Sequence, residues 1–432
     1  MSIKSTINSI IKEINYLILI VSAKNSKIIA GEDMLEEYGN IQKERMADIL
    51  RSILNSSEIT RGELSEKLNL SPSSIVKYIN KLIEIGLVRE SGLNKSTGGR
   101  RSIFLEFDSE IGVNISIIFN LSNIHGALVN PAGETVYELY LPTKKGIIKE
   151  DLLYSLFDII KNLRNMAQKI NKRIFGIGLG MGDYMDMKKG ISHEYLLSRD
   201  WKEVPLKEMV ESNFKLPFFL INDIDAGALG EKFYGRGIKV ENFVCIWLSE
   251  TVGMGMVLND RIYMGKKGFV GEIGHTNVIP DGDICTCGNR GCLETVATES
   301  FILKRCREGI GRGVFSKIIE ACDGDPSRLK IKDVIKASNN GDRFVRNIFL
   351  EVAGYIGSKL VDIANILNPE SIILRGSIID GNSFLYENIK RIIETKSLSV
   401  LADTIEVIYT DEATDIRIPG VSSYILMNYF SR

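Results

Sequence analysis

Apolar residues recur at the spacing of amphipathic helices between residues 42 and 85. The stretch QKERMADILR begins the first helix, and its apolar face consists of Met46, Ile49, Leu50 and Ile53. Thr60 lies three residues before Glu63, and this pair predicts a capping box at the start of a second helix. Ser71 caps a third helix, which has Pro72 at its first position and stops at Gly86.

Two short runs with strand character follow in LVRESGLNKSTGGRRSIFLEF, and a glycine-rich basic turn joins them. Three helices followed by a hairpin is the order of elements in a winged helix-turn-helix. We therefore predict a domain of this kind over residues 40–104, followed by a larger domain over residues 105–432. Residues 1–39 carry no motif, and their role is left open.

Beyond the hairpin the pattern changes to alternation and short apolar runs, both typical of strands. Residues 112–142 predict an antiparallel meander, and the runs at 174–181 and 217–223 predict buried strands. Helical stretches at 149–170 and after Glu294 alternate with these strands. The alternation indicates an α/β fold, and no tandem repeat is visible in the sequence.

The composition is that of an ordinary soluble protein. The chain has 432 residues, 44% of them hydrophobic and 25% charged, with a net charge of −1. Any surface for nucleic acid therefore has to be local. The apolar run from Tyr16 to Ala23 is shorter than the roughly 20 residues of a membrane span. Because no secretory signal is evident, we expect a cytoplasmic protein that has no membrane partner.

The predicted winged helix is locally basic. Residues 43–101 contain 11 Lys and Arg against 7 Asp and Glu. The recognition helix presents these residues on or near its polar side: Ser73, Ser74, Lys77, Tyr78 and Lys81. Arg100 and Arg101 in the wing segment STGGRR could enter a narrow minor groove. A three-helix module for protein contacts has the same pattern, but the basic wing favours DNA binding.

Three of the six cysteines lie within eight residues, in the loop CTCGNRGC. Glycines in this loop let the chain fold back so that the sulfur atoms converge. A structural zinc takes four nitrogen or sulfur ligands, and His275 is the nearest candidate for the fourth. We therefore predict a Zn2+ site formed by His275, Cys285, Cys287 and Cys292. A redox site is less favoured because Cys-x-Cys lacks the thioredoxin-like spacing, and a disulfide is less favoured in a reducing compartment.

The order of motifs resembles the ROK family of repressors, open reading frames and sugar kinases. The matching segments are IND at 221–223, TVGMG at 251–255, GEIGH at 271–275, CTCGNRGCLE at 285–294 and ILNPESIILRG at 366–376. The helix-turn-helix with its STGGRR wing is similar to the DNA-binding domain of ROK repressors. The resemblance covers roughly residues 40–432. It implies an actin-like, sugar-kinase fold with two α/β lobes around a ligand cleft, and a structural zinc that shapes the sugar site.

The resemblance also implies which residues contact the sugar. The matching positions are Asn222, Asp223, Glu272, His275 and Glu294. Carboxylate and amide groups can accept and donate hydrogen bonds around a ring of hydroxyl groups. In a kinase of this family, Asp223 would also be the catalytic base for the attacking hydroxyl.

The nucleotide side departs from the kinase pattern. The first phosphate loop of ROK kinases reads Asp-x-Gly-x-Thr, and this chain has Asn114, Ser116 and Ile118 there, within residues 112–118. A carboxylate, a hydroxyl and the glycine that lets backbone amides approach phosphate are thus replaced. Glu250 adds negative charge near the second loop, and Arg375 stands where kinases tend to have glycine. These departures predict that the protein is not an enzyme.

Three functional hypotheses follow. The leading one is a repressor of carbohydrate-utilisation genes that binds double-stranded operator DNA as a homodimer and is released by a sugar or sugar phosphate. The alternative is a bifunctional regulator that keeps sugar kinase activity through Asp223. The third is an interaction protein that has lost both activities.

Overall fold

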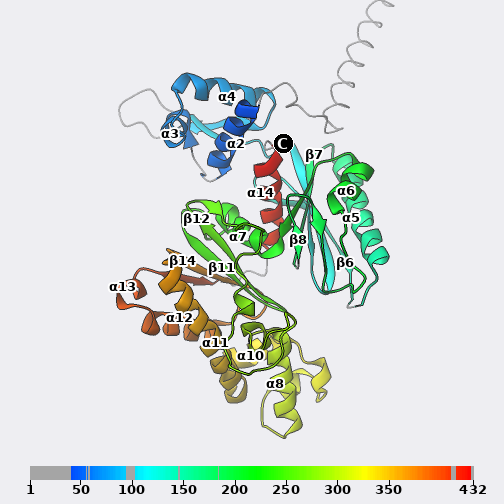
Figure 1. Cartoon of the computed structure of the whole chain (residues 1–432), viewed down its shortest axis with the longest axis vertical. Helices are drawn as coiled ribbons and strands as arrows, with labels where there is room; N and C mark the ends of the chain where they lie inside the picture. The colour runs from blue at the N-terminus through cyan, green and yellow to red at the C-terminus, as the bar shows by residue number, and fades with distance from the viewer. Residues whose placement is uncertain are drawn as a thin grey trace, which may run out of the picture. The chain divides into compact units, whose positions relative to one another are not determined.

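Figure 1 shows the computed structural model of the chain. It describes residues 40–54, 56, 59–93, 103–144, 146–182, 184–409 and 415–429. The predicted extension at 1–39 and the wing tip, with Arg100 and Arg101, lie outside the described residues. The chain forms two compact units: unit 1 comprises Met1–Ile221 and Val421–Arg432, and unit 2 comprises Asn222–Gly420.

Unit 1 begins with the predicted winged helix. Its elements are α2 (Asn40–Leu54), β1 (Ile59–Thr60), α3 (Arg61–Lys67), α4 (Pro72–Glu84), β2 (Val88–Leu93) and β3 (Ile103–Phe107). The strands form a sheet in the order β1-β3-β2. The apolar face predicted for the first helix is confirmed, since none of its four residues is more than 3% exposed. The capping box of Thr60 and Glu63 and the cap at Ser71 are also present.

A five-stranded sheet forms the rest of unit 1. Its strands are β4 (Gly112–Phe119), β5 (Asn123–Val129), β6 (Thr135–Pro142), β7 (Arg173–Met181) and β10 (Phe218–Asn222), in the order β10-β7-β4-β5-β6. β4, β5 and β6 form the predicted antiparallel meander, and β7 runs parallel to β4. Helix α5 (Lys149–Lys169) packs on one face and buries most of its leucines and isoleucines there. Smaller elements complete the unit: β8 (Met185–Asp186), β9 (Ile191–Ser192) and α6 (Leu206–Phe214).

Helix α14 (Arg417–Tyr429) covers the other face of this sheet. A Cβ atom added at Gly178 of β7 would lie 2.4 Å from Val421, and one at Gly176 would lie 2.9 Å from Ile425. Alternate residues of a strand point to opposite faces, so these glycines form one small-residue stripe on β7. The stripe explains the glycine alternation in IFGIGLGM, because it lets α14 approach the strand backbone closely.

Unit 2 is built on a second five-stranded sheet, in the order β13-β12-β11-β14-β15. The strands are β11 (Phe243–Leu248), β12 (Val252–Leu258), β13 (Arg261–Ile262), β14 (Ser371–Arg375) and β15 (Glu406–Tyr409). β11, β12 and β13 are antiparallel, whereas β14 is parallel to β11 and to β15. This sheet repeats the strand pattern of the first one, although no repeat is visible in the sequence.

Helices and short turns surround this second sheet. The longer helices are α7 (Asp223–Tyr234), α8 (Glu299–Gly311), α10 (Ile331–Asn339), α11 (Arg343–Leu367) and α12 (Ser383–Lys396). The shorter elements are η1 (Ile273–His275), η2 (Leu293–Thr295), α9 (Ile318–Ala321), η3 (Pro326–Arg328) and α13 (Ser399–Ala402). The predicted α/β class is therefore confirmed in both units. Among the helices that the structure describes, none is long and apolar enough to cross a membrane.

Candidate metal centre, effector site and nucleic-acid interface

The structure brings the four predicted metal ligands together. One ligand atom each from His275, Cys285, Cys287 and Cys292 lies within 4.8 Å of the others. The Nδ1 of His275 is 3.5 Å from the Sγ of Cys285, and the Sγ atoms of Cys287 and Cys292 are 3.7 Å apart. A tetrahedral zinc with bonds of about 2.3 Å to sulfur and about 2.0 Å to nitrogen needs separations of about 3.5 to 3.8 Å. These two separations therefore match those of a tetrahedral metal site, and all four ligand atoms lie within 4.8 Å of one another.

The loop around this cluster depends on its glycines. Gly288 and Gly291 have φ angles of +88° and +65°, in the left-handed region that disfavours residues with a Cβ atom. A Cβ atom at Gly291 would lie 1.7 Å from the backbone oxygen of Ile279. The predicted folding back of the loop is thus confirmed, and it requires glycine at position 291.

Charge around the cluster favours a bound cation. The Nε2 of His275 lies 3.9 Å from the Oε2 of Glu272, so a carboxylate adds negative charge beside the cluster. Burial and the neighbouring thiols raise the pKa of Cys292 to about 12, whereas the backbone N–H of Asn289 lowers the pKa of Cys287. A cation between the sulfur atoms would remove the repulsion between their thiolates. The donor set can therefore hold a metal such as zinc.

The residues predicted to contact a sugar all belong to unit 2. Asn222 ends β10 and caps α7, because its Oδ1 accepts hydrogen bonds from the backbone N–H groups of Ile224 and Asp225 at 2.9 and 3.3 Å. The oxygen of Asn222 is therefore used within the chain, and its amide group is what it can offer a ligand. Asp223 is the first residue of α7.

Electrostatic interactions relate three of the predicted carboxylates. Burial raises the pKa of Glu272, the charge of His275 opposes this shift, and the charges of Glu294 and Asp223 add to it. The Oε2 of Glu294 accepts a hydrogen bond from the backbone N–H of Val252 at 3.3 Å, at the start of β12. These residues therefore lie in one neighbourhood, next to the metal cluster.

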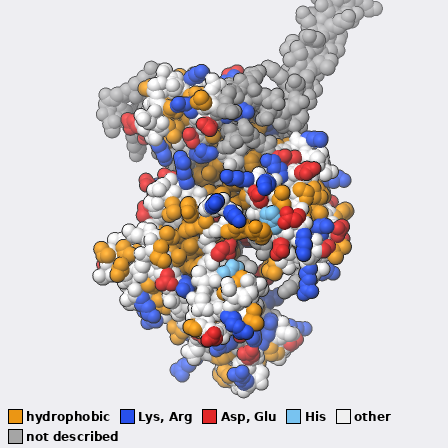
Figure 2. All heavy atoms as spheres, in the orientation of Figure 1, with side chains coloured by type: hydrophobic (Ala, Val, Ile, Leu, Met, Phe, Trp, Pro, Cys, Tyr) orange, Lys and Arg blue, Asp and Glu red, His pale blue; other side chains and the backbone are white. Residues whose placement is uncertain are grey.

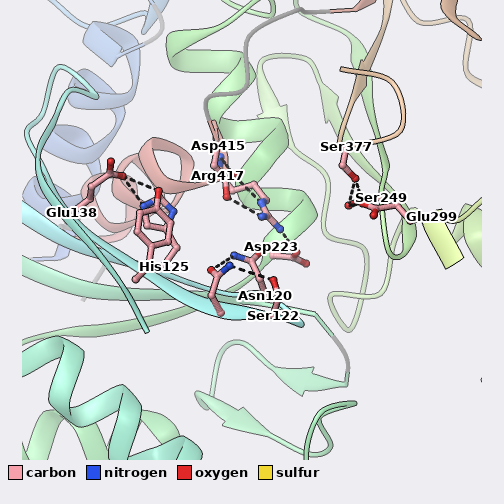
Figure 3. Close-up of polar contacts among 12 residues, drawn as sticks. Asn120, Ser122, His125, Glu138, Asp223, Ser249, Glu299, Ser377, Asp415 and Arg417 are labelled. Carbon is pink, nitrogen blue, oxygen red and sulfur yellow. Dashed lines mark hydrogen bonds and ion pairs between the residues drawn. The ribbon is translucent and has the colours of Figure 1, made fainter. Parts of the chain in front are cut away.

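Asp223 has a partner that no sequence pattern predicts. Figure 3 shows Arg417, whose Nη1 donates a hydrogen bond to the Oδ2 of Asp223 at 2.9 Å. The Nε and Nη2 of Arg417 each donate to Asp415 at 2.8 Å. The guanidinium group also lies over the ring of Trp247, 4.7 Å from its centre. No sequence signal identifies this pair, because 194 positions separate Arg417 from Asp223.

A second residue that the sequence analysis missed is Asp225, which is 4% exposed in α7. Burial and the charges of Asp223 and Glu272 raise the pKa of Asp225 to about 8. Burial also raises the pKa of Asp223, but the charge of Arg417 opposes that shift. The two carboxyl groups in the first turn of α7 therefore differ. Burial and neighbouring charges favour the protonated form of Asp225, whereas the ion pair with Arg417 favours the ionised form of Asp223. The DID spacing is the sequence signal for Asp225.

Helix α4 separates the predicted DNA-contacting residues into two groups. Ser73 and Lys77 are exposed, and so are Val76 and Asn80, which were not among the predicted contacts. Ser74 belongs to the helix cap, since its backbone N–H donates to the Oγ of Ser71 at 3.2 Å.

The remaining predicted contacts on α4 are engaged within the chain. Tyr78 is half-buried against the winged-helix core, and Lys81 pairs with Glu84 at 2.9 Å. On the face shown in Figure 2, basic and acidic side chains are interspersed, in line with the net charge of −1. Ser73 and Lys77 are therefore the predicted residues of α4 that are best exposed for a partner.

The stretch that corresponds to the first phosphate loop of ROK kinases is a buried strand. Asn114, Ser116 and Ile118 lie within β4, and each is 0% exposed. The Nδ2 of Asn114 donates a hydrogen bond to the Oγ of Ser422 on α14 at 2.9 Å. Residues at these positions are therefore covered by the chain itself.

The strand ends of the second sheet are also filled by side chains. Ser249 and Ser377 hydrogen-bond to each other at 2.8 Å, and Ser377 also donates to Glu299 (Figure 3). Arg375 pairs with Glu231 at 3.3 Å, with their side chains 5% and 2% exposed. These contacts leave carboxylates and a paired arginine at the carboxyl ends of β11 and β14.

The glycines of TVGMG have a packing role. Gly253 and Gly255 lie within β12, where a Cβ atom would be 3.0 Å from Ile224 and 2.7 Å from Ala228. Both contacts are with α7. These glycines therefore let α7 lie close against the strand, as the glycines of β7 do for α14.

Comparisons with known proteins agree with this arrangement. A sequence profile described as the ROK family matches residues 116–417, and one described as winged helix-turn-helix DNA-binding matches residues 46–89. The chain is 33% identical to the xylose repressor of Caldicellulosiruptor bescii over 354 residues, which are 81% of this chain and 87% of the relative. It is 27% identical to the xylose repressor of Bacillus subtilis over 391 residues, which are 90% and 96%.

Solved structures match as well. A ROK family transcriptional regulator, a homologue of the Escherichia coli MLC protein, has a TM-score of 0.78 and 25% identity over 91% of this chain and 98% of its own. A ROK family glucokinase from Streptomyces griseus, in complex with glucose and AMPPNP, has a TM-score of 0.63 and 22% identity over 72% and 99%. The likeness to the glucokinase concerns the fold alone.

Proposed function

The chain belongs to the ROK family, and from this premise we propose that it is a sugar-responsive repressor of carbohydrate-utilisation genes. The observation that carries the proposal is the presence of a winged helix and a ROK body in one chain. Two relatives named as xylose repressors match across both parts. An operator-reading surface and an effector site in the same chain are what a repressor needs for coupling between them.

The effector is a neutral sugar in this proposal. Asp223, Glu272 and Glu294 place carboxylates in one neighbourhood, and Asn222 adds an amide group. Hydroxyl groups suit such partners, whereas a phosphate would be repelled by them. His275 contributes through the metal cluster, because its Nδ1 faces Cys285 and its Nε2 faces Glu272.

We assign zinc to His275, Cys285, Cys287 and Cys292. Four protein ligands leave no open position, so the zinc would be structural and would hold the loop that carries the sugar-facing residues. Cys287→Ser should remove the zinc and weaken sugar binding, as measured by elemental analysis and calorimetry. Thr286→Ala, an exposed neighbour in the same loop, should keep the metal. A full zinc content in the Cys287 variant would refute the ligand assignment.

We assign DNA binding to α4 and to the wing. The proposed contacts are Ser73, Ser74, Lys77, Tyr78, Lys81, Arg100 and Arg101. Lys77 carries the sharpest test, since it is exposed on the recognition helix. A homodimer would present two such helices to the half-sites of a pseudo-palindromic operator.

The test is a gel shift with full-length protein and the DNA upstream of its own gene. Lys77→Ala should weaken DNA binding about tenfold. It should also reduce the slope of log affinity against log salt concentration by about one, the contribution of one phosphate contact. Lys189→Ala is the matched control, because the Lys189 side chain is 73% exposed in unit 1 but lies outside the winged helix. Absence of binding by the wild type at low salt would overturn the proposal.

The kinase alternative is disfavoured by the state of Asp223. A catalytic base needs an oxygen that can accept the proton of the sugar hydroxyl, and the Oδ2 of Asp223 already accepts a hydrogen bond from Arg417 at 2.9 Å. The burial of Asn114 and Ser116 in β4 further argues against phosphate binding there. We expect no ATP turnover in a coupled assay with D-xylose, D-glucose or N-acetyl-D-glucosamine. Turnover that Asp223→Ala abolishes would favour the bifunctional regulator instead.

A further inference from the structure

The two ends of helix α14 belong to different units. Residues 417–420 belong to unit 2, and the helix continues as part of unit 1 up to Tyr429. Its first residue, Arg417, holds the proposed effector-binding carboxylate of Asp223. A helix of 13 residues with a rise of about 1.5 Å per residue spans about 20 Å. One continuous element therefore extends from the effector site into unit 1.

The far end of α14 is part of the winged-helix core. Leu426 and Tyr429, 3% and 6% exposed, belong to the same hydrophobic cluster as Met46 and Leu50 of α2. The hydroxyl of Tyr429 accepts a hydrogen bond from Arg173 at 3.1 Å. A displacement of this end of α14 would thus act directly on the packing of the DNA-binding domain.

The stability of α14 itself does not explain an arginine at position 417. A helix N-terminus carries a partial positive charge, so a cation in the first turn is unfavourable by about 0.3–1 kcal/mol. The first turn of α14 contains no acidic residue, whereas that of α7 contains Asp223 and Asp225. Asp415 and Asp223 supply the negative charge that Arg417 needs. The arginine is therefore best explained by its partners.

The first turn of α14 is also fixed to α7 by packing. A Cβ atom at Gly420 would lie 1.7 Å from the backbone oxygen of Ala226, and one at Gly230 would lie 2.1 Å from that of Ile416. The two helices thus approach each other closely beside the Arg417–Asp223 ion pair. Small residues let the two backbones touch. Because the contact is close, a displacement of Asp223 would be passed on to α14 and not taken up by loose packing.

We propose that Arg417 is a positioning residue: it ties the carboxylate of Asp223 to the first turn of α14, and the helix transmits effector occupancy to the winged-helix core. The inference rests on the proposed function. A sugar hydroxyl that donates to Asp223 shares that carboxylate with Arg417 and changes the strength of the ion pair. The sugar then binds the protein with different affinities when Arg417 and Asp223 are paired and when they are not, which is the condition for coupling.

The test measures coupling in the full-length protein. Operator affinity is determined without sugar and at saturation with D-xylose, D-glucose or N-acetyl-D-glucosamine, after calorimetric titration of each sugar on each variant. The wild-type ratio of the two affinities should lie between about 5 and 150 for the sugar that acts as effector. Arg417→Gln should bring this ratio to within about twofold of one. Arg417→Lys should retain an intermediate ratio, because lysine keeps the charge but not the planar fork.

Arg305→Gln is the matched control. Arg305 also pairs with a carboxylate, that of Glu351 at 3.0 Å, and lies 5.6 Å from the ring centre of Phe301 in unit 2. This variant should keep the wild-type ratio. If the Arg417→Gln variant does not fold, the lysine variant decides: a ratio equal to that of the wild type overturns the inference.

Failure of the proposed function and failure of the inference about Arg417 would give different results. A wild type whose operator affinity responds to none of these sugars would contradict the proposed function, and the inference would fall with it. A wild type that responds, with an Arg417→Gln variant that responds equally at saturating sugar, would overturn the role of Arg417 and leave the proposed function standing.

Discussion

Helices α7 and α14 both pack on glycines of a strand but have opposite charges at their first residue. α7 packs on the glycines of β12 in unit 2, and α14 packs on the glycines of β7 in unit 1. Yet α7 begins with Asp223 and α14 begins with Arg417. Both helices thus pack on glycines of a strand, and they differ in the charge of the residue that begins each helix.

This difference separates residues that stabilise a helix from residues that serve a site. An aspartate at a helix N-terminus is favourable in itself, so Asp223 alone says little about function. An arginine there is unfavourable and has to be compensated, and Asp415 and Asp223 provide the compensation. The residue that opposes its own helix is therefore the more informative one.

The largest expected effect concerns the buried acid of α7. The pKa of Asp225 is about 8 in the folded chain, against an ordinary value of 3.8. Between about pH 4 and pH 8 the folded state keeps a proton that the unfolded state has lost. The free energy of unfolding therefore falls as pH rises through this window, by up to about 1.4 kcal/mol per pH unit. The stability of the Asp225→Asn variant relative to the wild type should therefore rise steadily from pH 5 to pH 8, as measured by thermal unfolding.

A difference between the two proteins that stays constant with pH would show that Asp225 is ionised in the folded chain. The contrast between a protonated buried acid in α7, Asp225, and an ion-paired arginine in α14, Arg417, would then disappear.

The next largest effect should come from Gly420 in the first turn of α14. A methyl group there meets the backbone oxygen of Ala226, so Gly420→Ala should lower the free energy of unfolding by about 3 kcal/mol. Gly354 in α11 is the matched control, because a Cβ atom at that position meets nothing within 4 Å. Gly354→Ala should raise the free energy of unfolding by about 0.5–1 kcal/mol. Equal effects in chemical denaturation would mean that α14 does not touch α7 closely.

The smallest effects compare the caps of the two helices. Asn222→Ala removes the cap of α7 and should cost about 1 kcal/mol. Asp415→Ala removes a hydrogen bond to the backbone N–H of Arg417 and also the paired contacts to its guanidinium group. Its cost should be about 2 kcal/mol, because charged hydrogen bonds contribute more than a neutral cap. Urea denaturation of both variants measures the difference, and a milder effect for Asp415→Ala would contradict the role given to this pair.

Local signals predicted much of the fold and the metal cluster. The capping box at Thr60, the cap at Ser71 and the cysteine loop each depend on residues close in sequence, and each is present as predicted. The glycines of TVGMG and IFGIGLGM gave a weaker signal, because a glycine can serve a ligand, a turn or a neighbouring helix. Only the fold shows that a helix lies against them.

Contacts between distant segments could not be predicted in this way. Arg417 looks like an unremarkable residue near the end of the chain, since nothing around it indicates a carboxylate 194 positions away. The predicted sugar contact of Asn222 stays a prediction: its oxygen caps α7, and its amide group is the part that it can offer a sugar. The predicted contacts of Ser73 and Lys77 with DNA stay predictions.

The hydrogen bond between Asn114 and Ser422 limits which residues position 114 can hold. An aspartate at position 114, as in the ROK kinase pattern, would place a carboxylate in a fully buried strand, next to helix α14. Such a charge is strongly destabilising unless a partner arises at the same time. Asn114→Asp should therefore lower the free energy of unfolding, because α14 covers β4 at this position.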